Sequence, residues 1–70
     1  MSEYVVIYEE ASDGWGAYLP DLPGVVSHGE TVEQAAAGIR EALELYLDEL
    51  RRAGRAVPQS RSLSGVVAAA

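Results

Sequence analysis

A thirteen-residue segment in the middle of the chain, LPDLPGVVSHGET at 19–31, constrains the fold more than any other part of the sequence. Pro20 has no backbone N–H to donate, so it ends a strand. Pro23 and Gly24 fit the two central positions of a type II turn, whose second position needs a positive φ. Thr31 opens a T-x-x-Q capping box, which marks a helix start. The segment therefore predicts a strand end, a tight turn, a short strand and a helix, in that order.

The residues around this segment predict three strands. Residues 3–10 (EYVVIYEE) and 15–19 (WGAYL) are short and rich in β-branched and aromatic side chains, which favours strands. The ASDG sequence at 11–14 predicts a turn between them, so the pair forms a hairpin. Both faces of 3–10 are apolar, and we therefore expect this strand to be central in its sheet. Residues 25–29 form the third predicted strand.

A long amphipathic helix follows. Apolar side chains recur with the helical period from Val32 to Leu50, which produces one apolar stripe. Gly54 offers the position just after the helix end, and Pro58 prevents the helix from resuming. The helix is therefore predicted over about 31–53.

The C-terminal residues complete the predicted fold. Residues 55–61 form a polar connection, and residues 62–68 are apolar and partly β-branched, which favours a last strand over a frayed tail. The fold class expected is α+β: a small antiparallel sheet with the order β-β-β-α-β and one helix packed on a face. Residues 1–70 are expected to form a single domain.

Composition excludes several kinds of site. The chain has no cysteine and one histidine, so disulfides, thiolate clusters and histidine metal sites are excluded, and we expect no metal and no cofactor. A chain of 70 residues buries only about 60% of the surface that its unfolded form exposes. Small scaffolds of this kind need a supplement, and we expect an oligomer.

The sequence shows neither a membrane helix nor a signal peptide, and these two features bear on where the protein is located. No apolar run approaches the roughly 18 residues that a membrane helix needs. The first residues, MSEYVVIYEE, lack the basic and small-residue features of a signal peptide. We therefore expect a cytoplasmic protein.

The charges are unevenly distributed. Residues 1–50 contain all eleven acids and one arginine, a sum of −10, whereas residues 51–70 contain four arginines and no acid, a sum of +4. An acidic body repels nucleic acid, whose binding depends on neutralising phosphates. It suits a basic protein partner and speeds the encounter with it. The alternative is that the charge serves solubility alone.

The sequence offers little catalytic chemistry. Ser27 and His28 are neighbours in a predicted strand and so point to opposite faces. The acidic residues do not fall on an apolar core face where they could hold two divalent metals for nuclease chemistry. The glycines do not follow the spacing of a phosphate-binding loop. We therefore expect that the protein is not an enzyme.

Residues 14–47 resemble the N-terminal domain of HicB-type antitoxins. The shared motifs are Gly14-Trp15, the PDLPG turn at 20–24, the G-x-T sequence at 29–31 and the Glu-Gln-Ala sequence at 33–35. The resemblance implies a partial ribonuclease-H-like layer. It also implies a role in a type II toxin–antitoxin system, because HicB proteins bind and block HicA, a small mRNA endoribonuclease toxin.

The sequence departs from this family in one respect. Many HicB proteins carry an appended helix-turn-helix or ribbon-helix-helix module that binds DNA. The 17 residues after Ala53 are too few for either, so direct DNA binding is not expected. The alternative function is an orphan oligomeric HicB-like domain, structural or regulatory, with no toxin partner.

Charge and loop position suggest the residues that contact a partner. The candidates for toxin binding are Glu9, Glu10, Asp13, Trp15, Asp21 and Leu22. Asp21 and Leu22 are included because we expect them to be exposed at the tip of the PDLPG turn, although a purely structural turn is the alternative. Self-association is expected through a free sheet edge or the outer side of the helix. The candidates there are Val25, Val26 and Leu45.

Overall fold

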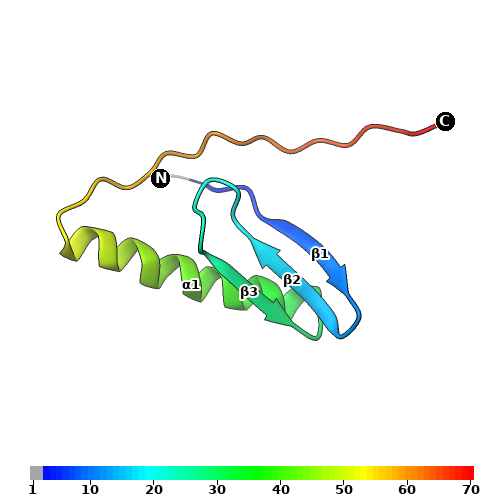
Figure 1. Cartoon of the computed structure of the whole chain (residues 1–70), viewed down its shortest axis with the longest axis horizontal. Coiled ribbons are helices and arrows are strands. Elements are labelled where there is room, and N and C mark those ends of the chain that lie inside the picture. Colours follow the sequence, from blue (N-terminus) through cyan, green and yellow to red (C-terminus); the bar gives the residue numbers. More distant parts are fainter. Residues whose placement is uncertain (1–2) are drawn as a thin grey trace.

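The computed structural model describes residues 3–70, which form three strands and one helix. The elements are β1 (Ile7–Ala11), β2 (Gly14–Tyr18), β3 (Val26–Gly29) and α1 (Val32–Arg52). The strands form one antiparallel sheet in the order β1-β2-β3, and α1 packs across one of its faces (Figure 1). The predicted α+β class, with an antiparallel sheet and a single helix, is confirmed.

β1 differs from the prediction in its place and its length. It is an edge strand and not a central one, and it begins at Ile7 and not at residue 3. The register pairs Ile7 with Tyr18, so an extension of it would set Val5 opposite Pro20, which has no N–H to donate. The ladder therefore stops where the PDLPG turn begins.

The hydrophobic core lies between the sheet and α1. Its buried side chains come from β2, the segment after it and the first half of the helix, and are those of Ala17, Leu19, Leu22, Val25, Ala35 and Ile39. Larger side chains, including Trp15 and Tyr46, pack around this cluster and are partly exposed. The core is small, as expected for a chain of this length.

The turn between β2 and β3 is held by three backbone hydrogen bonds. The N–H of Leu22 donates to the carbonyl of Leu19 at 3.1 Å, and the N–H of Val25 donates to the carbonyl of Leu22 at 3.1 Å. The N–H of Leu19 donates to the carbonyl of Val25 at 3.3 Å. Gly24 has a φ of +95°, as a type II turn requires. The two successive turns direct Leu22 into the core.

The start of α1 follows the predicted capping box with one variation. The hydroxyl of Thr31 accepts a hydrogen bond from the N–H of Gln34 at 3.1 Å. The side-chain oxygen of Gln34 accepts from the N–H of Glu30 at 2.8 Å, one residue before the cap. The first bond satisfies a backbone donor that the helix itself leaves free, and the second satisfies the N–H of the residue before the cap.

The end of α1 is a Schellman motif. Gly54 has a φ of +68°, and the N–H groups of Gly54 and Arg55 donate to the carbonyls of Arg51 and Leu50. The observed helix differs from the predicted one by a single residue at each end. Within residues 3–70 no helix combines the length and the apolar character needed to cross a membrane.

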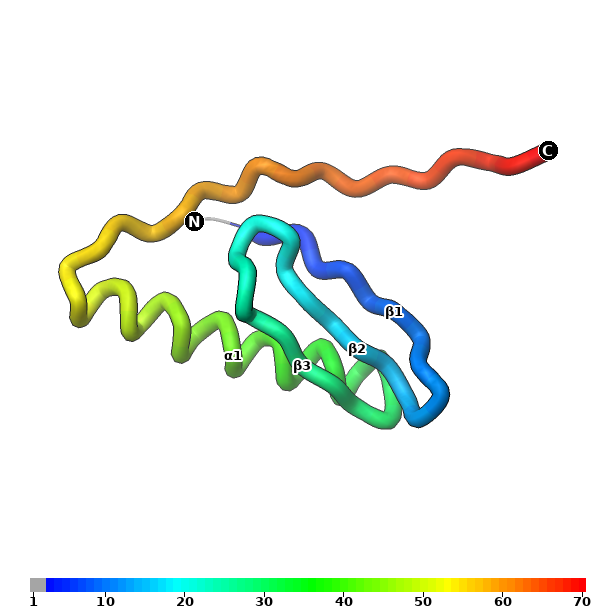
Figure 2. The backbone as a smooth tube through the Cα atoms, viewed as in Figure 1, coloured from blue at the N-terminus to red at the C-terminus, as the bar shows by residue number. Residues whose placement is uncertain are grey.

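After Gly54 the chain reverses and runs in an extended conformation back past the residues that precede β1 (Figures 1 and 2). The Tyr4 hydroxyl donates a hydrogen bond to the carbonyl of Pro58. The last strand expected over 62–68 does not form in the single chain, because no neighbouring strand pairs with these residues.

Candidate protein-binding surface

One face of the sheet is covered by α1 and the other is open. Trp15 and Ala17 face the helix, so the alternate residues of the strands lie on the open face. There Ile7 pairs with Tyr18, and Tyr18 pairs with Val26. Tyr18 is 38% exposed and Val26 is 61% exposed. An apolar row of three side chains, Ile7–Tyr18–Val26, therefore crosses the open face.

A polar row lies next to the apolar row. Glu9 pairs with Gly16, and Gly16 pairs with His28. The Nε2 atom of His28 lies 3.3 Å from a carboxylate oxygen of Asp13. Both side chains are well exposed, so this contact adds little stability. It places an imidazole and a carboxylate next to each other beside the open face.

Ser27 points to the covered side of the sheet, where its hydroxyl donates to the carbonyl of Ala35 at 2.7 Å. His28 points to the open side and contacts Asp13. The two residues therefore do not form a catalytic pair, in agreement with their alternation along the strand.

The structure brings four of the six predicted toxin contacts together. Glu9 and Glu10 lie at the end of β1, Asp13 lies in the following turn, and all three are exposed. Trp15 is directly opposite Glu10 in the ladder and is half-buried against the core. We call these four residues the hairpin tip. It carries three exposed carboxylates; Glu9 lies on the open side of the sheet and Glu10 on the side of Trp15.

The other two predicted contacts lie at the opposite end of the sheet. The expectation that Leu22 is exposed is wrong, because its side chain is fully buried in the core. The Asp21 carboxylate accepts hydrogen bonds from the N–H of Ser62 at 3.0 Å, the hydroxyl of Ser62 at 2.8 Å and the N–H of Arg61 at 2.9 Å. The Asp21 carboxylate is thus already hydrogen-bonded to residues of its own chain.

These bonds change the acidity of Asp21. The backbone N–H of Ser62 lowers the pKa of the carboxyl most, followed by the N–H of Arg61 and the hydroxyl of Ser62. The pKa therefore lies below its ordinary value of 3.8, because hydrogen bonds to the charged form favour that form. The group is an anchor for the C-terminal residues and is ionised at neutral pH.

The three residues predicted for self-association are in different environments. Val25 is 3% exposed and belongs to the core, so the expectation that it is available at a sheet edge is wrong. Val26 lies in the apolar row of the open face. Leu45 is 67% exposed on the outer side of α1.

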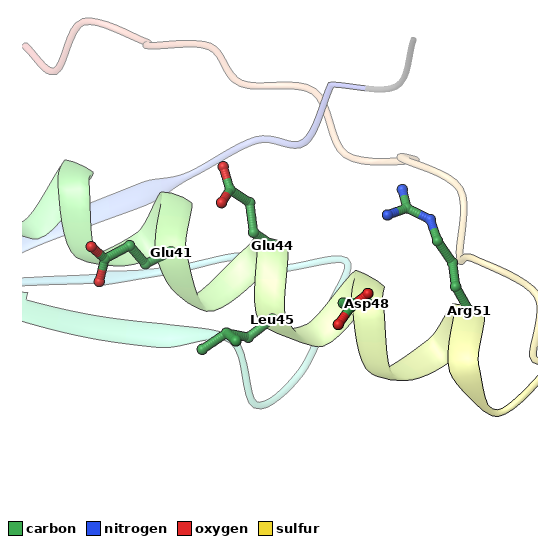
Figure 3. A pocket seen from close by; sticks show the side chains of 5 residues that line it. All are labelled: Glu41, Glu44, Leu45, Asp48 and Arg51. Carbon is green, nitrogen blue, oxygen red and sulfur yellow. The ribbon is translucent and has the colours of Figure 1, made fainter.

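The surroundings of Leu45 are polar and shallow. The side chains around it, shown in Figure 3, are those of Glu41, Glu44, Asp48 and Arg51. Gly38 lies on the side of α1 that faces β3. A Cβ atom at Gly38 would lie 3.0 Å from the Cβ of Ser27, so the glycine serves the packing of α1 on β3.

The apolar row and the contacts of Asp21 were not predicted. The row had a signal in the sequence, because Ile7, Tyr18 and Val26 each occupy alternate positions in short strands. The signal was missed because β1 was expected to be covered on both faces. Among the described residues, 3–70, no three carboxylate or imidazole groups come together as a metal-binding cluster.

The fold and these surfaces define a small acidic α+β protein whose exposed features suit contact with another protein. The chain belongs to the HicB-like antitoxin family: the family described as the HicB-like antitoxin of a bacterial toxin–antitoxin system matches residues 4–70. The resemblance seen in the sequence motifs is thereby confirmed.

The chain is also similar to short proteins named UPF0150. One from Helicobacter pylori is 43% identical over 44 residues, which cover 63% of this chain and 61% of that protein. One from Synechocystis is 40% identical over 57 residues, which cover 80% of this chain and 72% of that protein. One from Thermoplasma acidophilum is 30% identical over 61 residues, which cover 86% and 88%. The chain thus spans less than two thirds of the Helicobacter relative.

Proposed function

We propose that this protein is the antitoxin of a type II toxin–antitoxin system and that it neutralises a basic HicA-like mRNA endoribonuclease by covering its RNA-binding surface. The observation that carries the proposal is the family match over residues 4–70. The proposal includes the partial ribonuclease-H-like layer that the resemblance implies and a single domain over the whole chain. It does not include direct contact with DNA.

The charge of the body supports a basic partner. Residues 1–50 carry eleven acids against Arg40 alone, and the three carboxylates of the hairpin tip are each exposed, on both sides of the strand. A toxin that binds RNA presents cationic side chains to phosphates, and carboxylates compete for the same side chains. Charges are screened beyond about 8 Å at physiological salt. The carboxylates that matter must therefore lie at the contact itself.

The apolar row of the open face can supply binding affinity, which complementary charge alone does not. Complementary charges give specificity and a fast encounter more than affinity. Burial of apolar surface contributes about 25 cal/mol per Å², and the Ile7–Tyr18–Val26 row is exposed next to Glu9 and His28. We assign the toxin contact to the hairpin tip and the adjoining open face.

The test compares two charge reversals of equal size. The first variant combines Glu9→Lys, Glu10→Lys and Asp13→Lys at the hairpin tip. The control combines Glu41→Lys, Glu44→Lys and Glu49→Lys, three exposed positions of α1 away from the hairpin tip. Each is co-expressed with the small basic protein encoded beside this gene, and the affinity of the purified complex is measured at two salt concentrations.

We expect the hairpin-tip variant to lose rescue of growth and to bind at least about tenfold more weakly, whereas the control keeps both. Circular dichroism checks that each variant is folded. Equal losses in the two variants would show a general charge effect and contradict the assigned surface. If the unmodified protein neither rescues growth nor binds the toxin, the antitoxin proposal itself is wrong.

The alternative is an orphan oligomeric domain with no toxin. The exposed apolar residues at the C-terminal end of the chain favour it, because they suit self-association. The absence of a neighbouring gene for a small basic protein, together with the absence of a toxin in a pull-down, would support the orphan domain over the antitoxin.

A further inference from the structure

The last eight residues of the chain, 63–70, are apolar and have no packing partner. We call them the tail. Leu63 is 96% exposed, Val66 104% and Val67 93%. The tail carries no charged side chain, and no strand pairs with its backbone. An extended apolar segment with free N–H and C=O groups is suited to strand pairing.

The molecule is less compact than a typical protein of its mass, because the tail does not pack against the body. The accessible surface is 5553 Å², whereas a compact protein of 7.4 kDa has about 4,200 Å². The radius of gyration is 13.6 Å, whereas a compact chain of this length has about 11 Å. The extra surface is of the size that small proteins bury against a partner.

A receiving site exists at the free edge of β1. A groove of about 200 Å³ lies between this edge and α1. Its lining is apolar except for Arg40, and it includes Tyr4, Val6, Tyr8, Ile39 and Leu43. The backbone edge of β1 that faces away from β2 is unpaired. A strand added there would complete the ladder and cover the groove at once.

The tail does not fill this groove in its own chain. Asp21 holds Arg61 and Ser62, and beyond that point the tail diverges from β1 in the one view that Figures 1 and 2 share. Eight extended residues reach about 26 Å, whereas a five-residue strand such as β1 spans about 17 Å. The tail is therefore long enough to pair with the whole of a β1 strand in another molecule.

We propose that residues 63–68 of each chain add as a strand to the free edge of β1 in a second copy, in a reciprocal exchange. Leu63, Gly65 and Val67 share one side of the added strand, and we assign this side to the groove because it carries Leu63, the largest side chain of the tail. This self-association does not depend on the toxin proposal, and the two are tested separately.

The area of such an exchange is sufficient for a stable dimer. A free extended tail of this mass has about 1,000 Å² of accessible surface. If half of it is buried, with an equal area on the receiving edge, the two exchanged tails bury about 2,000 Å² in total. Stable protein–protein interfaces bury about 1,200–2,000 Å². The tail has no charged side chain, so its side chains add no repulsion between two acidic bodies.

The mass of the protein in solution tests the exchange. Sedimentation of the full chain at micromolar concentration should give a dimer. Leu63→Asp combined with Val67→Asp places two charges in the groove and should weaken the dimer at least about a hundredfold. Ser64→Asp combined with Ala68→Asp adds the same charge to the other side of the strand and should leave the dimer in place.

A second measurement distinguishes a tail that pairs with β1 of another molecule from a tail that pairs with β1 of its own chain. In a mixture of isotopically labelled and unlabelled copies, filtered nuclear Overhauser effects should connect the Val67 methyl groups with the Tyr8 ring between molecules. A monomer at high concentration, a dimer that survives Leu63→Asp with Val67→Asp, or contacts found only within one molecule would each overturn the proposal. The tail does not pack on its own body, so these variants still fold.

Discussion

The carboxylate of Asp21 accepts hydrogen bonds from both the backbone N–H and the hydroxyl of Ser62, which lies 41 positions later in the chain. A third bond comes from the N–H of Arg61. One turn residue therefore decides where the C-terminal segment leaves the body. Four expectations about stability and acidity follow from this and other contacts.

The anchor at Asp21 should depend on pH only in strong acid. The pKa of Asp21 lies below 3.8, chiefly because of the N–H of Ser62. A carboxyl group whose pKa is lower in the folded protein stabilises it above the unfolded value, and this contribution is lost as the pH falls through the folded pKa. The anchor should therefore be intact at pH 3.8 and above, and it should be released only as the pH falls through the lower pKa of the folded protein.

The pH dependence is measured by nuclear magnetic resonance, following the Asp21 carboxyl and the amide signals of Arg61 and Ser62 together. Asp21→Asn removes the titrating group and should abolish the common transition. A carboxyl that titrates at or above 3.8, or amide signals that do not move with it, would contradict the assignment.

Leu22→Ala should be the most damaging truncation in the turn. The side chain is fully buried, and a buried leucine shortened to alanine costs about 2–5 kcal/mol. Leu45→Ala makes the same change at a site that is 67% exposed, and it should cost less than about 0.5 kcal/mol. Urea unfolding of both variants provides the comparison. Similar losses would mean that Leu22 is not a core residue.

Gly29→Ala should destabilise the junction between β3 and α1. A Cβ atom there would lie 2.6 Å from the backbone nitrogen of Ala35, so the helix start must shift, at a cost of about 1–3 kcal/mol. Gly16→Ala is the control, because its nearest neighbour would be 3.9 Å away. Thermal unfolding should show a lowered midpoint for the first variant, and a tolerated Gly29→Ala would refute the close approach.

Thr31→Ala should remove the N-cap of α1. The lost bond to the N–H of Gln34 predicts a cost of about 1 kcal/mol. Thr31→Ser keeps the hydroxyl and should be close to the original protein in stability. Hydrogen exchange at the Gln34 amide reports the cap directly, and unchanged exchange in Thr31→Ala would show that another group satisfies this donor.

The sequence was most informative where a few neighbouring residues determine the structure. Gly24 in its turn, Thr31 at the helix start and Gly54 at the helix end each adopt the predicted conformation. These features depend on φ preferences and on hydrogen bonds within about five residues. The bounds of α1 were accurate for the same reason.

The errors concern positions that depend on the order of the strands. β1 is an edge strand, and its apolar residues on both sides did not reveal this. Leu22 follows a polar residue and precedes a proline, which looks like an exposed loop, yet two successive turns direct it inward. No local pattern links Asp21 to Ser62 across 41 positions. Such contacts arise only from the tertiary arrangement.

Two adjacent residues of the PDLPG turn contact different parts of the protein. Leu22 is buried in the core, and Asp21 holds the C-terminal segment. A substitution in this turn therefore disturbs two parts of the protein at once. The three carboxylates of the hairpin tip, at the other end of the sheet, contact neither the core nor the C-terminal segment. Substitutions at the exposed Glu9, Glu10 and Asp13 should disturb neither the core nor the C-terminal segment, so the two ends of one small sheet differ in how much change of sequence the fold tolerates.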